Sequence, residues 1–204
     1  MCGISGIINM DKSPVHEKQL SDMMIRMKHR GPNDDGIFVE GNVGLGFVRL
    51  SILDLSAAGH QPMFSPDERF VIIFNGEIFN YVELREELRS KGHSFRTQTD
   101  TEVLLAAYLE WGEQMLHKLN GMWAFVIYDR RDKVLFGASD RYGVKPFYYC
   151  INDGQIIFAS EIPSILEVLK NKPSVHNTSV FEYLLFNRTD QTEDTFFDEI
   201  KKLN

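Results

Sequence analysis

Cys2 directly follows the initiator methionine, so removal of Met1 leaves a thiol and a free α-amine on one residue. A free α-amine titrates at about 7.7–8.0 and a thiol at about 8.5. Near neutral pH the amine can therefore accept the thiol proton while sulfur attacks a carbonyl carbon, and no histidine is needed. The alternative is that Cys2 is a small apolar residue at the head of a buried strand.

Three other fragments carry the polar groups that such an attack on a small zwitterion needs. Attack on an amide places negative charge on the carbonyl oxygen, and the Asn75 side-chain amide and the Gly76 N–H can both donate to it. A bound amino acid also has a carboxylate, which suits the guanidinium of Arg49, and an ammonium, which suits the carboxylates of Glu77 and Asp100. Taken together, these residue types indicate a site for an amino-acid amide.

Each fragment also has a purely structural interpretation. The pair Asn75-Gly76 is the strongest short signal for a type I′ hairpin turn. Asp100 lies in the first turn of an expected helix, where a negative charge is favourable, and Arg49 could form an ordinary ion pair. His29 and His60 are expected to be loop histidines with satisfied hydrogen bonds. No spacing of histidine, cysteine and acidic residues predicts a metal site.

Composition excludes several classes of partner. The chain has 204 residues and a formal charge of −7, so it lacks the basic surface that nucleic-acid binding requires. Its two cysteines, Cys2 and Cys150, are too few for a disulfide framework and favour a reducing cytoplasm. No basic leader precedes an apolar run, and no stretch approaches the ~20 apolar residues of a membrane span. We expect a soluble cytoplasmic protein with no nucleic-acid or membrane partner.

The hydrophobic pattern predicts antiparallel sheets covered by helices. Short apolar runs joined by turn residues predict strands at 3–8, 37–39, 43–48, 70–74, 122–128, 134–138, 146–151 and 155–159. Helical spacing predicts helices opening at Ser13-Pro14 and covering 81–88, 99–109 and 180–186, with a loop over 29–36. The segment at 99–102 has the form of a capping box. Because most strands follow one another as hairpins, we expect an α+β fold, not a doubly wound parallel sheet.

The fragments together resemble the glutaminase domain of class II glutamine amidotransferases, and within that family the asparagine synthetase branch. Eight matching fragments occur in the family's order over nearly the whole chain: MCGI (1–4), KHRGP (28–32), RLSILD (49–54), AGHQPM (58–63), FNGEIFN (74–80), TDTEV (99–103), GMWAF (121–125) and DRYGVKP (140–146). Many members have histidine and a polar residue where this chain has Phe47 and Val48, so the surroundings of Arg49 differ here.

The resemblance implies a four-layer αββα fold of the N-terminal-nucleophile hydrolases with two stacked antiparallel sheets. It also implies roles for the site residues. Cys2 would be the nucleophile, its amine the base, and Asn75 with the Gly76 N–H the oxyanion hole. The residues that would bind the substrate L-glutamine are Arg49, Asn75, Glu77, Asp100 and the backbone of Ser51, Ile52 and Leu53. Glutamine would be hydrolysed to glutamate and ammonia through a γ-glutamyl thioester, with no cofactor or metal in this domain.

The resemblance further divides the chain into a glutaminase domain at 2–170 and a connector at 171–204. The family's second domain binds ATP with a Ser-Gly-Gly-x-Asp-Ser loop, which this sequence lacks. ATP and Mg are thus expected only in a C-terminal synthetase domain of the same polypeptide, where ammonia would amidate aspartate or another carboxylate. Two alternatives stay open: a non-catalytic regulatory or scaffolding fragment, and an N-terminal-cysteine acylase acting on another amide.

Overall fold

Two antiparallel sheets form the centre of the molecule. The computed structural model describes residues 1–189 and 191–203. One sheet has the order β10 (Ile200–Lys202), β8 (Tyr148–Asn152), β9 (Gln155–Ala159), β1 (Gly3–Asn9), β3 (Val43–Arg49) and β2 (Asp34–Glu40). The other has the order β4 (Met63–Phe64), β5 (Phe70–Ile78), β6 (Gly121–Asp129) and β7 (Val134–Ser139). The strand pairs within both sheets are antiparallel, as the hairpin pattern predicts.

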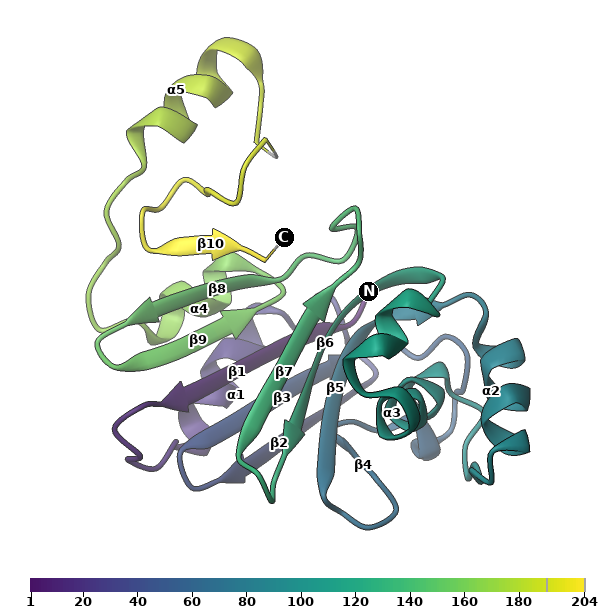
Figure 1. Cartoon of the computed structure of the whole chain (residues 1–204). Helices are drawn as coiled ribbons and strands as arrows, with labels where there is room; N and C mark the ends of the chain where they lie inside the picture. The colour runs from purple at the N-terminus through teal and green to yellow at the C-terminus, as the bar shows by residue number, and fades with distance from the viewer. Residues whose placement is uncertain (190, 204) are drawn as a thin grey trace.

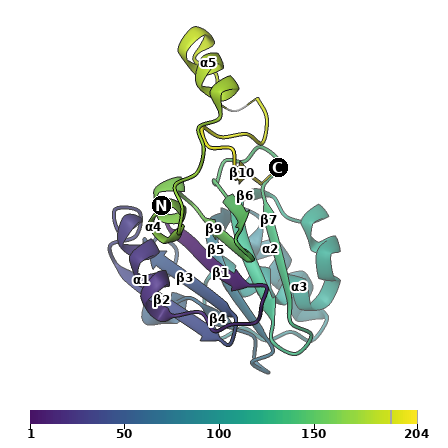
Figure 2. The ribbon, with the colours of Figure 1, turned by 90° about the vertical axis from the view of Figure 1, so that its left-hand side faces the viewer.

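Helices cover the outer face of each sheet. On the six-stranded sheet lie α1 (Glu17–Arg26) and α4 (Ile162–Val168), whose apolar side chains pack in one cluster with those of β1 and β9. On the four-stranded sheet lie α2 (Tyr81–Ser90), α3 (Asp100–Trp111) and the short helix η2 (Gly112–His117). The order helix, sheet, sheet, helix gives four layers (Figures 1 and 2).

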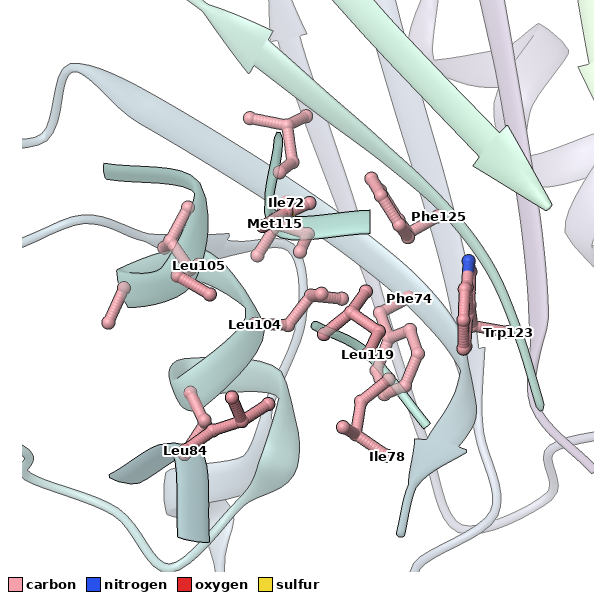
Figure 3. Close-up of a cluster of buried hydrophobic side chains, with 14 of the residues drawn as sticks. Ile72, Phe74, Ile78, Leu84, Leu104, Leu105, Met115, Leu119, Trp123 and Phe125 are labelled. Carbon is pink, nitrogen blue, oxygen red and sulfur yellow. The ribbon is translucent and has the colours of Figure 1, made fainter. Parts of the chain in front are cut away.

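Strand β5 shows how one sequence serves two cores. Phe74 and Ile78 pack on the outer side against Leu84 of α2 and Leu104 of α3 (Figure 3). Alternate residues of the same strand, represented by Ile73, point the other way into a cluster shared with β1 and β3 of the facing sheet. The continuous apolar run of β5 thus reflects a strand buried on both faces.

The structure moves three expected boundaries. The first helix begins at Glu17, three residues after Pro14, and the loop after it is shorter than expected because β2 already begins at Asp34. Strand β5 does not stop before Asn75-Gly76: these residues pair with Ala124 and Trp123 of β6, and the strand continues to Ile78. The hairpin-turn interpretation of Asn75-Gly76 is therefore wrong.

The predicted capping box at the start of α3 is half formed. The Thr99 hydroxyl accepts a hydrogen bond from the Glu102 backbone N–H at 3.2 Å, as an N-cap should. The Glu102 carboxylate does not return to the Thr99 backbone. It accepts instead from the backbone N–H groups of Arg96 and Thr97 at 2.9 and 2.7 Å, and so fixes the loop that leads into the helix.

The chain beyond residue 170 leaves the four layers and returns to them. Helix α5 (Asn177–Phe186) stands away from both sheets in two perpendicular views (Figures 1 and 2). Strand β10 then rejoins the molecule by pairing with β8. Five large hydrophobic side chains of α5 are exposed: Phe181, Tyr183, Leu184, Leu185 and Phe186. Among the described residues, no helix combines the length and apolarity that crossing a membrane requires.

Candidate active site

The alternation of side chains along two strands of the six-stranded sheet directs Arg49 and Cys2 into the space between the sheets. On β3, Leu45 and Phe47 face the inner cluster, so Arg49 at the end of the strand continues the same face. On β1, Ile4 faces that cluster, and Cys2 packs against it two residues earlier. The β1–β3 register pairs Ile4 with Phe47, so its continuation brings Cys2 beside Arg49.

The same alternation along β5 of the four-stranded sheet directs polar side chains into the space between the sheets from the opposite side. Val71 and Ile73 face the inner cluster, and Asn75 and Glu77 follow them at intervals of two residues. The polar end of β5 therefore points toward the six-stranded sheet. Because the strand continues through Asn75, the alternation that builds the core also delivers the candidate oxyanion donor.

Seven of the predicted site residues line one pocket: Cys2, Arg49, Ile52, Leu53, Gly76, Glu77 and Asp100. Asn75 is buried next to the pocket-lining Gly76 in the strand, with 1% of its surface exposed. Ser51 is the exception among the predicted residues, because it faces a neighbouring hollow with Asn33 and donates its backbone N–H to the Asn33 side chain at 3.0 Å.

The Cys2 sulfur is held at the end of β3 by one residue. The Leu50 backbone N–H donates to Sγ at 3.4 Å, and the thiol donates to the Leu50 carbonyl at 3.6 Å. Burial raises the pKa of the Cys2 thiol, although the Leu50 hydrogen bond and the positive charges of the N-terminus, Arg49 and Lys145 act to lower it. A buried thiol with a raised pKa is largely protonated at neutral pH, so it needs a base in order to attack.

The Arg49 guanidinium is oriented by backbone, not by an acidic side chain. Its Nη1 donates to the Ser56 carbonyl at 2.8 Å and its Nη2 to the Asp54 carbonyl. Gly59 lies against it so closely that a Cβ there would be 2.0 Å from Nη2, so any side chain at this position would displace the guanidinium. The interpretation of Arg49 as half of an ordinary ion pair is therefore wrong among the described residues. Its charge is available for a ligand.

Two hydrogen-bond donors beside the pocket lack a partner in the described part of the chain. The first is Nδ2 of Asn75, which is buried and makes no hydrogen bond. The second lies on the edge of β5 that faces away from β6. On that edge the N–H of Phe74 is bonded to the Gln61 side chain at 2.6 Å and that of Ile78 to the Asp100 carboxylate at 3.0 Å. The Gly76 N–H lies between them, on the same edge, because alternate N–H groups point the same way.

Asp100, the first residue of α3, is a buried carboxylate facing the pocket. Its Oδ2 accepts the hydrogen bond from Ile78, so its role goes beyond favouring the helix dipole. The pKa of Asp100 is raised to about 6, mainly by burial and also by the negative charge of Glu77, while the hydrogen bond from the Ile78 backbone opposes the rise. A cationic group placed between the two carboxylates would relieve both effects.

Several residues that position the site were not assigned a role from the sequence. Gln61 bonds both the Phe74 N–H and the Thr101 hydroxyl at 3.1 Å, and so ties β5 to α3. Gly31 allows the loop before β2 to pack closely against the end of β3. A Cβ at this position would be 2.4 Å from the backbone nitrogen of Arg49. Gly31, Gly59 and Gln61 all belong to matched motifs, and that was the signal available in the sequence.

The two candidate histidines lie outside the pocket. His29 contacts Glu161 at 3.0 Å and His60 contacts Asp34 at 2.8 Å, so both have polar partners outside the pocket, as expected. Within ranges 1–189 and 191–203, no group of three or more histidine, cysteine or acidic side chains is arranged to hold a metal ion.

Comparison with known proteins shows the family to which the chain belongs. The profile of a family described as "Glutamine amidotransferase domain" matches residues 1–204. Asparagine synthetase [glutamine-hydrolyzing] 1 of Bacillus subtilis is 45% identical over 194 residues, which cover 91% of this chain and 30% of that protein. Putative asparagine synthetase [glutamine-hydrolyzing] 2 of Methanocaldococcus jannaschii is 41% identical over 203 residues, covering 90% of this chain and 39% of that one.

Among solved structures, the glutamine phosphoribosylpyrophosphate amidotransferase of B. subtilis superposes with a TM-score of 0.69 at 22% identity, covering 80% of this chain and 43% of that one. At that identity the likeness concerns the fold. The four layers are the predicted αββα arrangement of the N-terminal-nucleophile hydrolases. The chain belongs to the glutamine amidotransferase domain family, and it spans 30–39% of the length of the two asparagine synthetases above.

Proposed function

We propose that this chain hydrolyses L-glutamine to glutamate and ammonia through a γ-glutamyl thioester on Cys2. The observation that carries the proposal is the convergence of a buried thiol, a guanidinium without an acidic partner and two unbonded donors on one pocket. Each group answers one requirement of an amino-acid amide: a nucleophile for the amide carbon, an anchor for the α-carboxylate and an oxyanion hole.

Glutamine binds by its charged head. Arg49 holds the α-carboxylate, since the loop carbonyls orient its guanidinium and leave its charge unpaired. Glu77 and Asp100 hold the α-ammonium, and the ammonium stabilises the ionised form of Asp100 against burial. Ile52 and Leu53 complete the rim, whereas Ser51 lines the neighbouring hollow.

The first half of the reaction releases ammonia. With Met1 removed, the Cys2 amine takes the thiol proton while sulfur forms a bond to the side-chain amide carbon of glutamine. The Asn75 amide and the Gly76 N–H donate to the oxygen that becomes negative. The amine then passes its proton to the amide nitrogen, the carbon–nitrogen bond breaks, and ammonia leaves with the thioester in place.

The second half regenerates the thiol. The same amine takes a proton from water, whose oxygen attacks the thioester carbon, and the developing negative charge again falls on the oxygen facing Asn75 and Gly76. The carbon–sulfur bond breaks, sulfur recovers the proton, and glutamate leaves. One α-amine thus acts as base and acid in both halves.

The ammonia is proposed to serve an asparagine-synthetase-like amidation of aspartate or another carboxylate. This rests on the 41–45% identity to proteins named as glutamine-hydrolysing asparagine synthetases, of which the chain spans 30–39%. The proposed partner is a C-terminal synthetase domain of the same polypeptide, which would bring ATP and Mg. Residues 2–170 would be the glutaminase domain and 171–204 the connector, and the exposed apolar side chains of α5 would pack against that partner. The free thiols of Cys2 and Cys150 support a cytoplasmic location.

Glutamate release from glutamine by the Met1-processed protein tests the proposal. We expect Cys2→Ala to abolish release and Cys150→Ala, the other cysteine, to retain it. Intact mass must first show that Met1 is absent, because a retained Met1 blocks the amine. Equal turnover by wild type and Cys2→Ala would refute glutamine hydrolysis at this site. Efficient cleavage of simple amides without an α-carboxylate would favour the acylase alternative.

A further inference from the structure

Lys145 is a buried lysine at the amino terminus whose charge is not neutralised nearby. Only 7% of its surface is exposed. Its Nζ donates a hydrogen bond to Met1 Sδ at 3.4 Å, and it forms no ion pair with a carboxylate among the described residues. A buried ammonium without a carboxylate partner is energetically costly, so such a group at a reactive terminus calls for a functional explanation.

The loop that carries Lys145 is fixed by Asp140. The Asp140 carboxylate is buried and accepts hydrogen bonds from four backbone N–H groups, those of Trp123, Tyr142, Val144 and Lys145, each at 3.1 Å. Three of these donors belong to the loop itself, so the carboxylate closes the loop and ties it to β6. The lysine backbone is therefore held in one place beside the terminus.

Removal of Met1 changes what the ammonium of Lys145 faces. In the unprocessed chain the Lys145 ammonium contacts the Met1 side chain, and the Met1 amine donates to the Arg30 carbonyl at 3.1 Å. Cleavage removes the Met1 side chain and leaves the Cys2 amine as the nearest end of the chain. The Cys2 position is already fixed from the other side, because Arg30 Nε donates to the Cys2 carbonyl at 2.9 Å.

Several other charged groups surround Cys2 and Lys145, and they come from different helices, strands and loops. Arg30, which follows α1, is paired with Glu161 at 2.9 Å, so their charges largely cancel. Arg49 from β3, Asp54 from the loop after it, Glu77 from β5 and Asp100 from α3 line the pocket, while Asp140 after β7 and Lys202 of β10 lie at the loop that carries Lys145. Glutamine would pair its own charged groups with Arg49, Glu77 and Asp100. Asp140 directs its oxygens to four backbone N–H groups and forms no ion pair with the Lys145 ammonium, so among the described residues this lysine is a cation beside Cys2 without a carboxylate bonded to it.

We infer that Lys145 is a positioning residue that keeps the processed Cys2 amine unprotonated and favours its thiolate, so that base and nucleophile are ready at neutral pH. The inference rests on the proposed function. A nearby cation disfavours a second ammonium and favours an anion, and both effects act in the direction that the attack needs. Lys145 takes no proton and forms no bond in the reaction; it acts through its charge.

The test compares Lys145→Met, which removes the charge at nearly equal length, with Lys145→Arg, which keeps it, and with Lys172→Met, an exposed lysine, as the matched control. The pH dependence of kcat/KM for glutamine is measured on Met1-processed protein. We expect the acidic limb of Lys145→Met to move to higher pH by about one unit, a loss of up to about tenfold at neutral pH, and that of Lys145→Arg and Lys172→Met to stay.

A second readout does not depend on glutamine. The rate of Cys2 alkylation by iodoacetamide is followed against pH, with Cys2→Ala reporting any background from the fully buried Cys150. Lys145→Met should require higher pH for the same rate, and Lys145→Gln gives the same expectation if the methionine variant does not fold. Unchanged profiles in both readouts overturn the inference. The wild type could release no glutamate while Lys145→Met still shifts the pH profile of alkylation. That result would support the inference about Cys2 and overturn only the proposed reaction.

Discussion

The pocket at the end of the two sheets and the surface of α5 each leave groups without partners, but the groups are of opposite kinds. In the pocket the unpartnered atoms are polar and buried, such as Nδ2 of Asn75 in a side chain 1% exposed. On α5 the uncovered atoms are apolar and exposed, such as the Leu184 side chain, 74% of which is exposed. Both are unfavourable in isolation.

The difference indicates what each region needs. A buried donor without an acceptor can be satisfied by a small polar ligand that enters its pocket and brings an acceptor with it. An exposed apolar helix face is satisfied by a second apolar surface, which a polypeptide supplies. The pocket is therefore best tested by activity and α5 by stability and association.

Asn75→Ala, which removes the unpartnered polar group of the pocket, should have the largest effect, a loss of kcat. Loss of one oxyanion donor costs about 10²–10³ in kcat, or about 3–4 kcal/mol. Because Nδ2 makes no hydrogen bond within the described chain, the variant should still fold cooperatively, which a thermal scan checks. Asn171→Ala, at an exposed asparagine, is the matched control for steady-state glutaminase assays. A kcat within threefold of wild type would contradict the assignment of Asn75.

Asp100→Asn should separate stability from binding. The pKa of Asp100 is raised to about 6 in the folded chain, against 3.8 as its ordinary value. Between these values the folded state binds more protons than the unfolded state, so this group's contribution to stability is full below about 3.8 and is lost as pH rises to about 6. Asparagine cannot ionise, so wild type should lose up to about 3 kcal/mol relative to the variant across this interval.

The same change should weaken substrate binding, since it removes a carboxylate from the α-ammonium. We expect a higher KM for glutamine together with higher stability at pH 7, measured by urea unfolding at several pH values. For wild type, KM should also rise as pH falls through about 6, when Asp100 becomes protonated. If the difference in unfolding free energy does not change with pH, Asp100 is not the buried acid described.

Leu184→Ser, on the exposed apolar surface of α5, should have the smallest effect on the free energy of unfolding. Surface substitutions usually change unfolding free energy by no more than about 0.5 kcal/mol, and we expect that range for this exposed leucine. Leu104→Ser on α3 is the matched control, because Leu104 is fully buried and truncation of a buried leucine costs about 2–5 kcal/mol. Equal losses in the two variants would show that α5 is packed after all.

How far sequence alone predicts this molecule depends on whether a feature is local or assembled. Short apolar runs bounded by turn residues predict the strands, and the resemblance predicts the layers. The Asn75-Gly76 pair shows where local reasoning fails, because its turn propensity is overridden by nine consecutive pairings between β5 and β6. Which lysine reaches Met1 depends on segments 144 residues apart, so no local pattern records it. The carbonyls that hold Arg49 are only five and seven residues further along the chain, but every residue type has such an oxygen, so the sequence does not mark them.

The hydrogen bonds that orient Arg49 have a consequence for which residues of this domain can change during evolution. Main-chain oxygens of Asp54 and Ser56 set its direction, and every amino acid supplies such an oxygen. Side chains along that loop can therefore diversify, altering the rim that a neighbouring domain meets, while the anchor for the substrate's acid group is insulated from the drift. Gly59, which leaves room for the guanidinium, lacks this freedom, and so do Asp54 and Ser56, whose side chains form hydrogen bonds within the loop.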